Sequence, residues 1–170
     1  MKILRFTFLS KKQIIFVFLY LLISGCSKQK KIEQPVAYNH AIHVSEAGLD
    51  CIDCHTGVEK KMYASLPSIK RCKSCHSIMQ GESAAEALVV EAVNNNVEIP
   101  WKPIYELEDY VFFSHRRHVK SGKISCAVCH GEVEKLVKPP SKQLVPISMK
   151  GCLKCHDNKS ISNDCLTCHV

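Results

Sequence analysis

Apolar residues are unevenly distributed along this chain. One unbroken apolar run, Ile14–Ile23, follows a basic N-terminal segment. Ten residues are too few for a comfortable membrane span but suit the apolar region of an export signal. Further along, Ser83-Ala84-Ala85-Glu86 has the form of a capping box, Ala87–Val93 continues as a helix, and Asn94–Asn96 ends it. The remaining pattern predicts a mostly irregular fold with short α-helices.

Two connecting stretches have a different pattern. Val111–Phe113 predicts a short strand or extended run, and Val137–Met149, which holds three prolines, predicts an irregular loop. Pro100–Pro103 predicts an extended turn around Trp101. We expect the Trp101 ring to have a packing role, and a role in electron entry is the alternative.

The chain contains an ungapped repeat. Asn39–Lys60 reads NHAIHVSEAGLDCIDCHTGVEK and recurs from Ser114 to Lys135 as SHRRHVKSGKISCAVCHGEVEK. Both copies keep two histidines in H-x-x-H spacing, then C-x-x-C-H, then Val-Glu-Lys. The sequence therefore predicts a duplicated unit.

C-x-x-C-H is the attachment signal for haem c, in which two thiols bind the porphyrin and the following imidazole binds the iron. It occurs five times and predicts five haems c. The attachment pairs are Cys51 and Cys54, Cys72 and Cys75, Cys126 and Cys129, Cys152 and Cys155, and Cys165 and Cys168. The proximal ligands are His55, His76, His130, His156 and His169. Zinc ribbons use C-x-x-C knuckles in pairs, which an odd number of motifs fits poorly.

Composition fits a small fold with haems as its core. The chain has 170 residues, 11 cysteines and only 7% aromatic residues, so ordinary core material is scarce. The formal charge of +7 includes four basic residues before position 26, and haem propionates would offset the rest. We therefore expect no nucleic-acid partner.

The N-terminus predicts export and anchoring. Ile23-Ser24-Gly25-Cys26 resembles a bacterial lipobox, which implies a signal peptide of residues 1–25, lipidation of Cys26 and a tether over residues 26–35. An uncleaved anchor beginning near Phe6 is the alternative. Both interpretations place the protein at the periplasmic face of a bacterial membrane, with the leaflet open.

The haem motifs divide the remaining chain. We expect a dihaem module at residues 36–80, a helical linker at 81–109 and a trihaem module at 110–170. The four histidines outside the motifs form the two H-x-x-H pairs: His40, His43, His115 and His118. Spacing i, i+3 puts both imidazoles of a pair on one helical turn, where they can reach two neighbouring haems. Surface histidines are the alternative.

These motifs resemble class III multihaem cytochromes c. That resemblance implies that His40 binds the Cys51–His55 haem and His115 the Cys126–His130 haem, with His43 and His118 reaching two of the others. The stretches Ile99–Trp101 and Tyr110–His115, with Ser148-Met149 before Cys152, also resemble pentahaem subunits of menaquinol-oxidising complexes such as alternative complex III. The resemblance implies electron transfer between a quinol-linked respiratory complex and periplasmic or outer-membrane carriers, other cytochromes among them.

Four distal histidines cannot serve five irons. The internal methionines Met62, Met79 and Met149 are candidates for the fifth distal ligand. Met149, three residues before Cys152, is singled out because its counterpart in the first module is Ile69, while a gap-filling role beside porphyrin is equally open. An open iron would instead favour a small nitrite or hydroxylamine reductase, although the histidines leave no spare proton donor. A surface conduit to extracellular acceptors is a third possibility.

Overall fold

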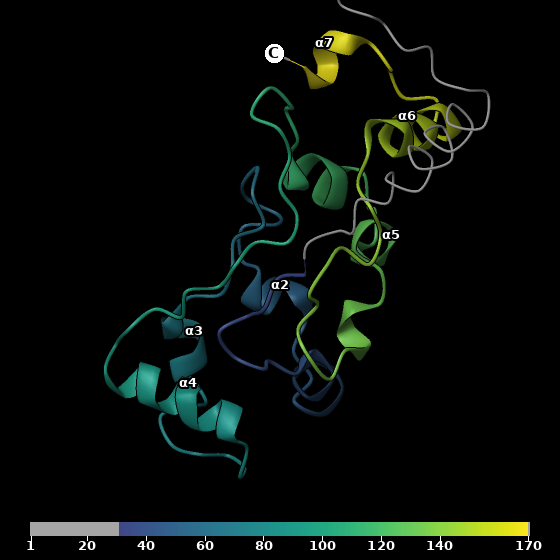
Figure 1. The fold of residues 1–170 in the computed structure, drawn as a ribbon. Helices are drawn as coiled ribbons and strands as arrows, with labels where there is room; N and C mark the ends of the chain where they lie inside the picture. Colours follow the sequence, from purple (N-terminus) through teal and green to yellow (C-terminus); the bar gives the residue numbers. More distant parts are fainter. Residues whose placement is uncertain (1–30, 170) are drawn as a thin grey trace, which may run out of the picture. The chain divides into compact units, whose positions relative to one another are not determined.

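A computed structural model describes residues 31–169. The export signal and Cys26 lie outside the described residues. The described chain consists of short helices and turns joined by long irregular segments, as expected (Figure 1). Its helical elements are η1 (Ile42–Glu46), α2 (Cys51–Cys54), α3 (Ile69–Lys73), α4 (Ala84–Asn94), η2 (Arg116–Ser121), α5 (Cys126–His130), η3 (Val133–Lys135), α6 (Met149–Asn158) and α7 (Cys165–Cys168).

The hydrophobic core is very small. Val36, Ile69, Val89 and Val93 form its buried cluster, in which α3 packs against α4. Trp101 packs at the edge of this cluster, in agreement with a packing role. Many large apolar side chains elsewhere are exposed, including Leu166 at 82% and Tyr63 at 76%. A chain with this little buried apolar surface needs another source of core material.

The two repeats have the same local structure. The second histidine of each H-x-x-H pair lies in a short π-helical turn, His43 in η1 and His118 in η2. The hydrogen bonds also correspond: Leu49 N–H donates to the His43 carbonyl, and Ile124 N–H donates to the His118 carbonyl. Single π turns occur often at functional sites, because the wider turn redirects side chains.

The long helix α4 begins and ends where its sequence predicts. The Ser83 hydroxyl accepts the Ala85 N–H, and Asn95 follows the last helical residue. One half of the predicted capping box is wrong. Glu86 does not cap the backbone N–H of Ser83; its carboxylate accepts from the N–H groups of Gln80 and Gly81 instead.

The segment around Val111 is extended, as predicted. Val111 forms an isolated antiparallel bridge with His169, and Phe112 N–H donates to the Cys168 carbonyl. These contacts fix the end of the chain against the approach to the second repeat. Within residues 31–169, no helix has the length and apolar character required to cross a membrane.

Candidate haem-binding sites

Every C-x-x-C-H motif has its cysteines on or beside a short helix. The motif helices are α2, α3, α5, α6 and α7, and the ten motif cysteines are free thiols. Hydrogen-bonding N-cap residues begin two of these helices: the Ser148 hydroxyl accepts the Gly151 N–H, and Asp164 accepts the Leu166 N–H. Each motif therefore presents two accessible thiols with an imidazole directly after them.

Histidines distant in sequence form pairs of one spacing. The ring centres of His43 and His76 lie 6.0 Å apart. Those of His115 and His130 lie 6.3 Å apart, and those of His118 and His156 lie 6.2 Å apart. Each pair joins one H-x-x-H histidine to one C-x-x-C-H histidine.

This spacing fits a single metal ion between two rings. Imidazole–metal bonds of about 2 Å on each side, plus about 1 Å from nitrogen to ring centre, separate the centres by roughly 6 Å. The described residues contain no cluster of three or more His, Cys, Asp or Glu side chains suited to hold a metal by themselves. The donor set therefore fits haem irons with two imidazoles each, and the exposed apolar side chains fit porphyrin faces.

Hydrogen bonds hold most of these imidazoles through Nδ1. The carbonyl oxygens of Asn39 and Ser114 lie 2.8 and 2.9 Å from Nδ1 of His43 and His118, respectively. Nδ1 of four others is held as well: His55 by the Ser65 carbonyl, His76 by the Glu86 carboxylate, His115 by the Met62 carbonyl and His156 by the Ser162 carbonyl. A partner that accepts at Nδ1 fixes the tautomer with a free Nε2, which is the form that ligates a metal.

His40 differs from the other distal histidines. Burial, together with the nearby His55 and His43 imidazoles, lowers its pKa to about 4. Its Nδ1 is buried without a hydrogen-bond partner. The low pKa keeps His40 neutral, as a metal ligand must be. Its proximity to His55 agrees with the expected pairing at the first haem.

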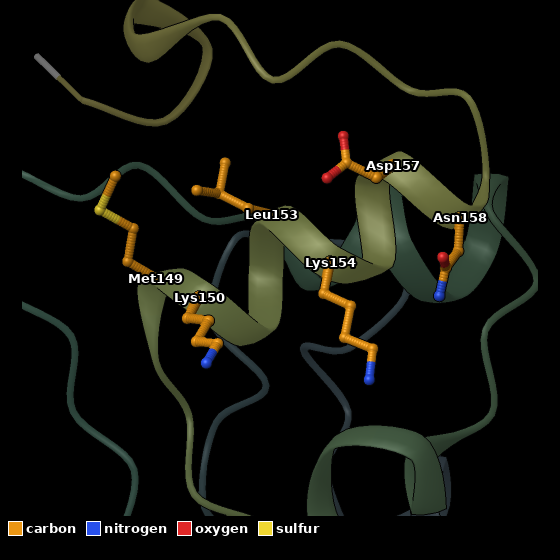
Figure 2. A pocket seen from close by; sticks show the side chains of 6 residues that line it. All are labelled: Met149, Lys150, Leu153, Lys154, Asp157 and Asn158. Atoms are coloured by element: carbon orange, nitrogen blue, oxygen red, sulfur yellow. The ribbon is translucent and has the colours of Figure 1, made fainter.

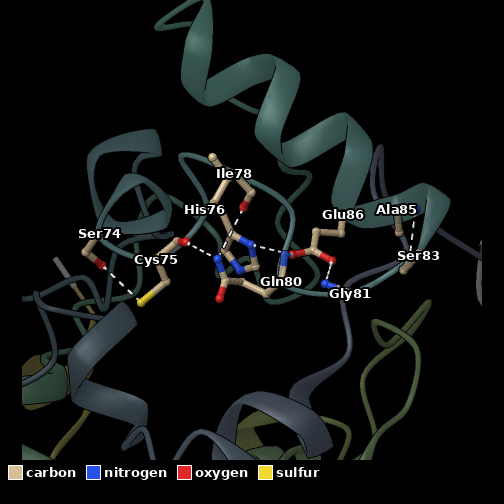
Figure 3. A network of polar contacts seen from close by, with 9 residues as sticks. All are labelled: Ser74, Cys75, His76, Ile78, Gln80, Gly81, Ser83, Ala85 and Glu86. Atoms are coloured by element: carbon tan, nitrogen blue, oxygen red, sulfur yellow. Dashed lines mark hydrogen bonds and ion pairs between the residues drawn. The ribbon is translucent and has the colours of Figure 1, made fainter.

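Glu86 is a functional residue that sequence reasoning missed. Its Oε1 lies 3.0 Å from Nδ1 of His76 (Figure 3). The hydrogen bonds from the backbone of Gln80 and Gly81, with that from His76, hold the pKa of Glu86 below its usual range. An ionised carboxylate behind a proximal imidazole makes that imidazole a more basic ligand. Glu86 stands three residues after Ser83 at the start of α4, and in the sequence this position indicated a helix cap.

One aromatic ring organises each H-x-x-H pair. Tyr38 stacks on His43 with ring centres 4.4 Å apart and meets His40 edge-on at 4.7 Å. Phe113, at the corresponding position of the second repeat, stacks on His118 at 4.5 Å and meets His115 edge-on at 4.9 Å. The ring two residues before each pair thus fixes two imidazoles at once.

The final motif has a different neighbourhood. The Tyr110 ring stacks near His169 at 5.8 Å, and no second histidine is paired with His169 among the described contacts. Met149 begins α6 and is 62% exposed, whereas Ile69, its counterpart at the start of α3, is 4% exposed. An open cavity of about 640 Å³ runs along α6, and Met149, Leu153, Lys150 and Lys154 all line it. Met149 and Leu153 project from one side of the helix, and Lys150 and Lys154 from another (Figure 2).

Comparisons with known proteins identify the family to which the chain belongs. Residues 23–99 match the class III cytochrome c family, and residues 111–170 match the family of cytochrome c7 and related cytochromes c. The chain is also 34% identical, over 163 residues, to the multihaem cytochrome c subunit of menaquinone reductase from Nitratidesulfovibrio vulgaris. That alignment covers 81% of this chain and 77% of the relative.

The fold and the paired imidazoles are those of a multihaem cytochrome c, a protein that transfers electrons. More particularly, the chain belongs to the class III multihaem cytochromes c. The expected fold class and the expected electron-transfer role are both confirmed.

Proposed function

We propose that this protein is a pentahaem subunit of a membrane-bound menaquinone reductase and carries electrons between a periplasmic donor and the quinone-reactive part of that complex. The spacing of 6.0–6.3 Å in three imidazole pairs carries the proposed electron transfer, and the 34% identity to a menaquinone reductase subunit supports the proposed complex. The two imidazoles of such a pair would hold one haem iron between them and leave no position for a substrate, which favours electron transfer over substrate binding. When bound, each haem supplies one-electron exchange at its iron.

The distal residues follow from this geometry. Three distal histidines lie opposite motif histidines: His43 opposite His76, His115 opposite His130 and His118 opposite His156. His40 is assigned to His55, which is near enough to contribute to its lowered pKa, so that four irons are accounted for. Met149 is proposed for the iron of the Cys165–His169 motif, because that motif lies close to α6. Burial raises the pKa of Cys152 on α6, and the nearby Cys168 thiol raises it further. An exposed thioether one turn before Cys152 is therefore near the last site.

The proposed direction of electron flow is towards the quinone. The similar subunit from Nitratidesulfovibrio vulgaris is named for a menaquinone reductase. This is the reverse of the direction that a likeness to menaquinol-oxidising complexes implies. Lipidation of Cys26 would keep the subunit at the membrane, since two acyl chains give stable anchoring.

Native purification tests the assignment to a complex. A C-terminally tagged chain should co-purify with membrane subunits that reduce a menaquinone analogue from an artificial electron donor. Its haems should be oxidised when the quinone analogue is added. A chain that purifies alone from gently solubilised membranes, with haems that the quinone analogue leaves reduced, would contradict it.

A further inference from the structure

The two repeats exchange hydrogen bonds reciprocally. Ala41 N–H in the first repeat donates to the Leu136 carbonyl, just after the second repeat. Arg116 N–H in the second repeat donates to the Lys61 carbonyl, just after the first. Ala41 corresponds to Arg116 and Lys61 to Leu136 in the ungapped alignment. The same two positions thus meet twice, each time with the donor in one repeat and the acceptor at the end of the other. Such a reciprocal contact is the signature of a twofold axis.

Residues on such an axis contact their own counterparts. Cys51 and Cys126 occupy the same position in the two repeats, and burial together with the neighbouring Cys126 thiol raises the pKa of Cys51. A repeat related by translation would not bring equivalent residues together.

We propose that the two repeats form a pseudo-dimer within one chain, with the porphyrins held by Cys51 and Cys126 facing each other at the local twofold axis. This inference rests on the proposed haem binding. The contact would be the junction through which the first two attachment sites communicate with the last three.

The other attachment sites continue outward from this junction. On one side Cys54 lies near Cys72, whose pKa is raised by burial and then by that thiol. On the other side His115 and His118, three residues apart, pair with His130 and His156, so the motifs of Cys126 and Cys152 are neighbours. Cys152 in turn lies near Cys168. The five sites therefore form one unbranched series, with the motifs ending in His76 and His169 at its two ends. An electron crossing the junction oxidises one ferrous haem and reduces the other ferric haem, and no bond is made or broken.

The reduced, diamagnetic holoprotein allows a direct test by nuclear Overhauser spectroscopy. Each haem is assigned through contacts between its thioether protons and the β protons of its own cysteines. We expect cross-peaks between substituents of the Cys51 haem and the Cys126 haem. The haems of Cys72 and Cys165, at opposite ends of the series, serve as the control pair and should show none.

The two possible failures are distinguishable. Contacts of the Cys51 haem with the Cys72 haem, but none with the Cys126 haem, would overturn the pseudo-dimer while leaving haem binding intact. A chain that carries no covalent haem, by intact mass, would instead remove the proposed function on which the inference rests.

Discussion

The imidazoles of His118 and His156 lie with ring centres 6.2 Å apart, although one stands in η2 and the other in α6. His43 and His76 repeat this relationship at 6.0 Å in the other half of the chain. Each second histidine of an H-x-x-H pair thus reaches the motif that follows its own repeat. The first histidine turns back towards its own C-x-x-C-H motif.

The pairing of His43 with His76 and of His118 with His156 predicts that the two distal histidines serve different irons. His118→Ala should convert one low-spin haem to high spin while all haems remain covalently attached, because the cysteines are untouched. Low-temperature EPR of the oxidised holoprotein measures the change. His43→Ala should affect a different low-spin signal from the one lost in His118→Ala.

Lys120→Ala is a matched control, since it lies in the same turn as His118 and outside the imidazole pairs. Unchanged low-spin signals in both histidine variants would show that these residues are not ligands.

Glu86 should lower the midpoint potential of the haem bound by His76. Glu86→Gln keeps a hydrogen-bond acceptor 3.0 Å from Nδ1 but removes the negative charge that favours ferric iron. We expect one midpoint potential to rise by some tens of millivolts, on a scale where a tenfold change in equilibrium is about 59 mV for one electron. A spectroelectrochemical titration measures it.

The exposed Glu82→Gln variant controls for a general change of charge. Equal shifts in the two variants would argue against a specific role of the Glu86–His76 contact.

Much of the site could be predicted from the sequence, because covalent attachment requires adjacent residues. The five motifs, the duplicated unit and the proximal histidines are all local patterns. The partner of His43 stayed open, since it depends on how α3 lies against η1. The Glu86 contact with His76 and the reciprocal bonds between repeats depend on tertiary structure in the same way.

The aromatic residue before each histidine pair is visible in the sequence, but its role is not. Tyr38 and Phe113 occupy equivalent places before the two histidine pairs, but they differ in residue type and lie just outside the aligned repeat. Only the stacking on His43 and His118 shows that they orient two imidazoles each.

Met149 should set the highest midpoint potential in the protein. Thioether ligation raises the potential relative to paired imidazoles. Met149→Leu keeps the volume and removes the sulfur, so we expect loss of a weak far-red absorbance band and a fall in the highest midpoint potential. Met79→Leu is the control thioether.

A wild-type protein that binds carbon monoxide at one haem, with potentials that Met149→Leu does not change, would contradict Met ligation. That result would favour the open iron of a small reductase.

Cys26 should anchor the protein. Cys26→Ser removes the acceptor of the lipid and should release the chain from the membrane or block its processing. Fractionation and N-terminal analysis measure the outcome. A variant that remains fully membrane-bound and starts at Met1 would identify the apolar run as an uncleaved anchor.

The number and ligation of the covalent haems test the central claim most directly. Intact mass and pyridine haemochrome absorbance of the purified protein should both give five haems per chain, and EPR should assign at least four of them to low-spin iron with two imidazoles. A count of three or fewer, or stoichiometric zinc in place of iron, would contradict the account.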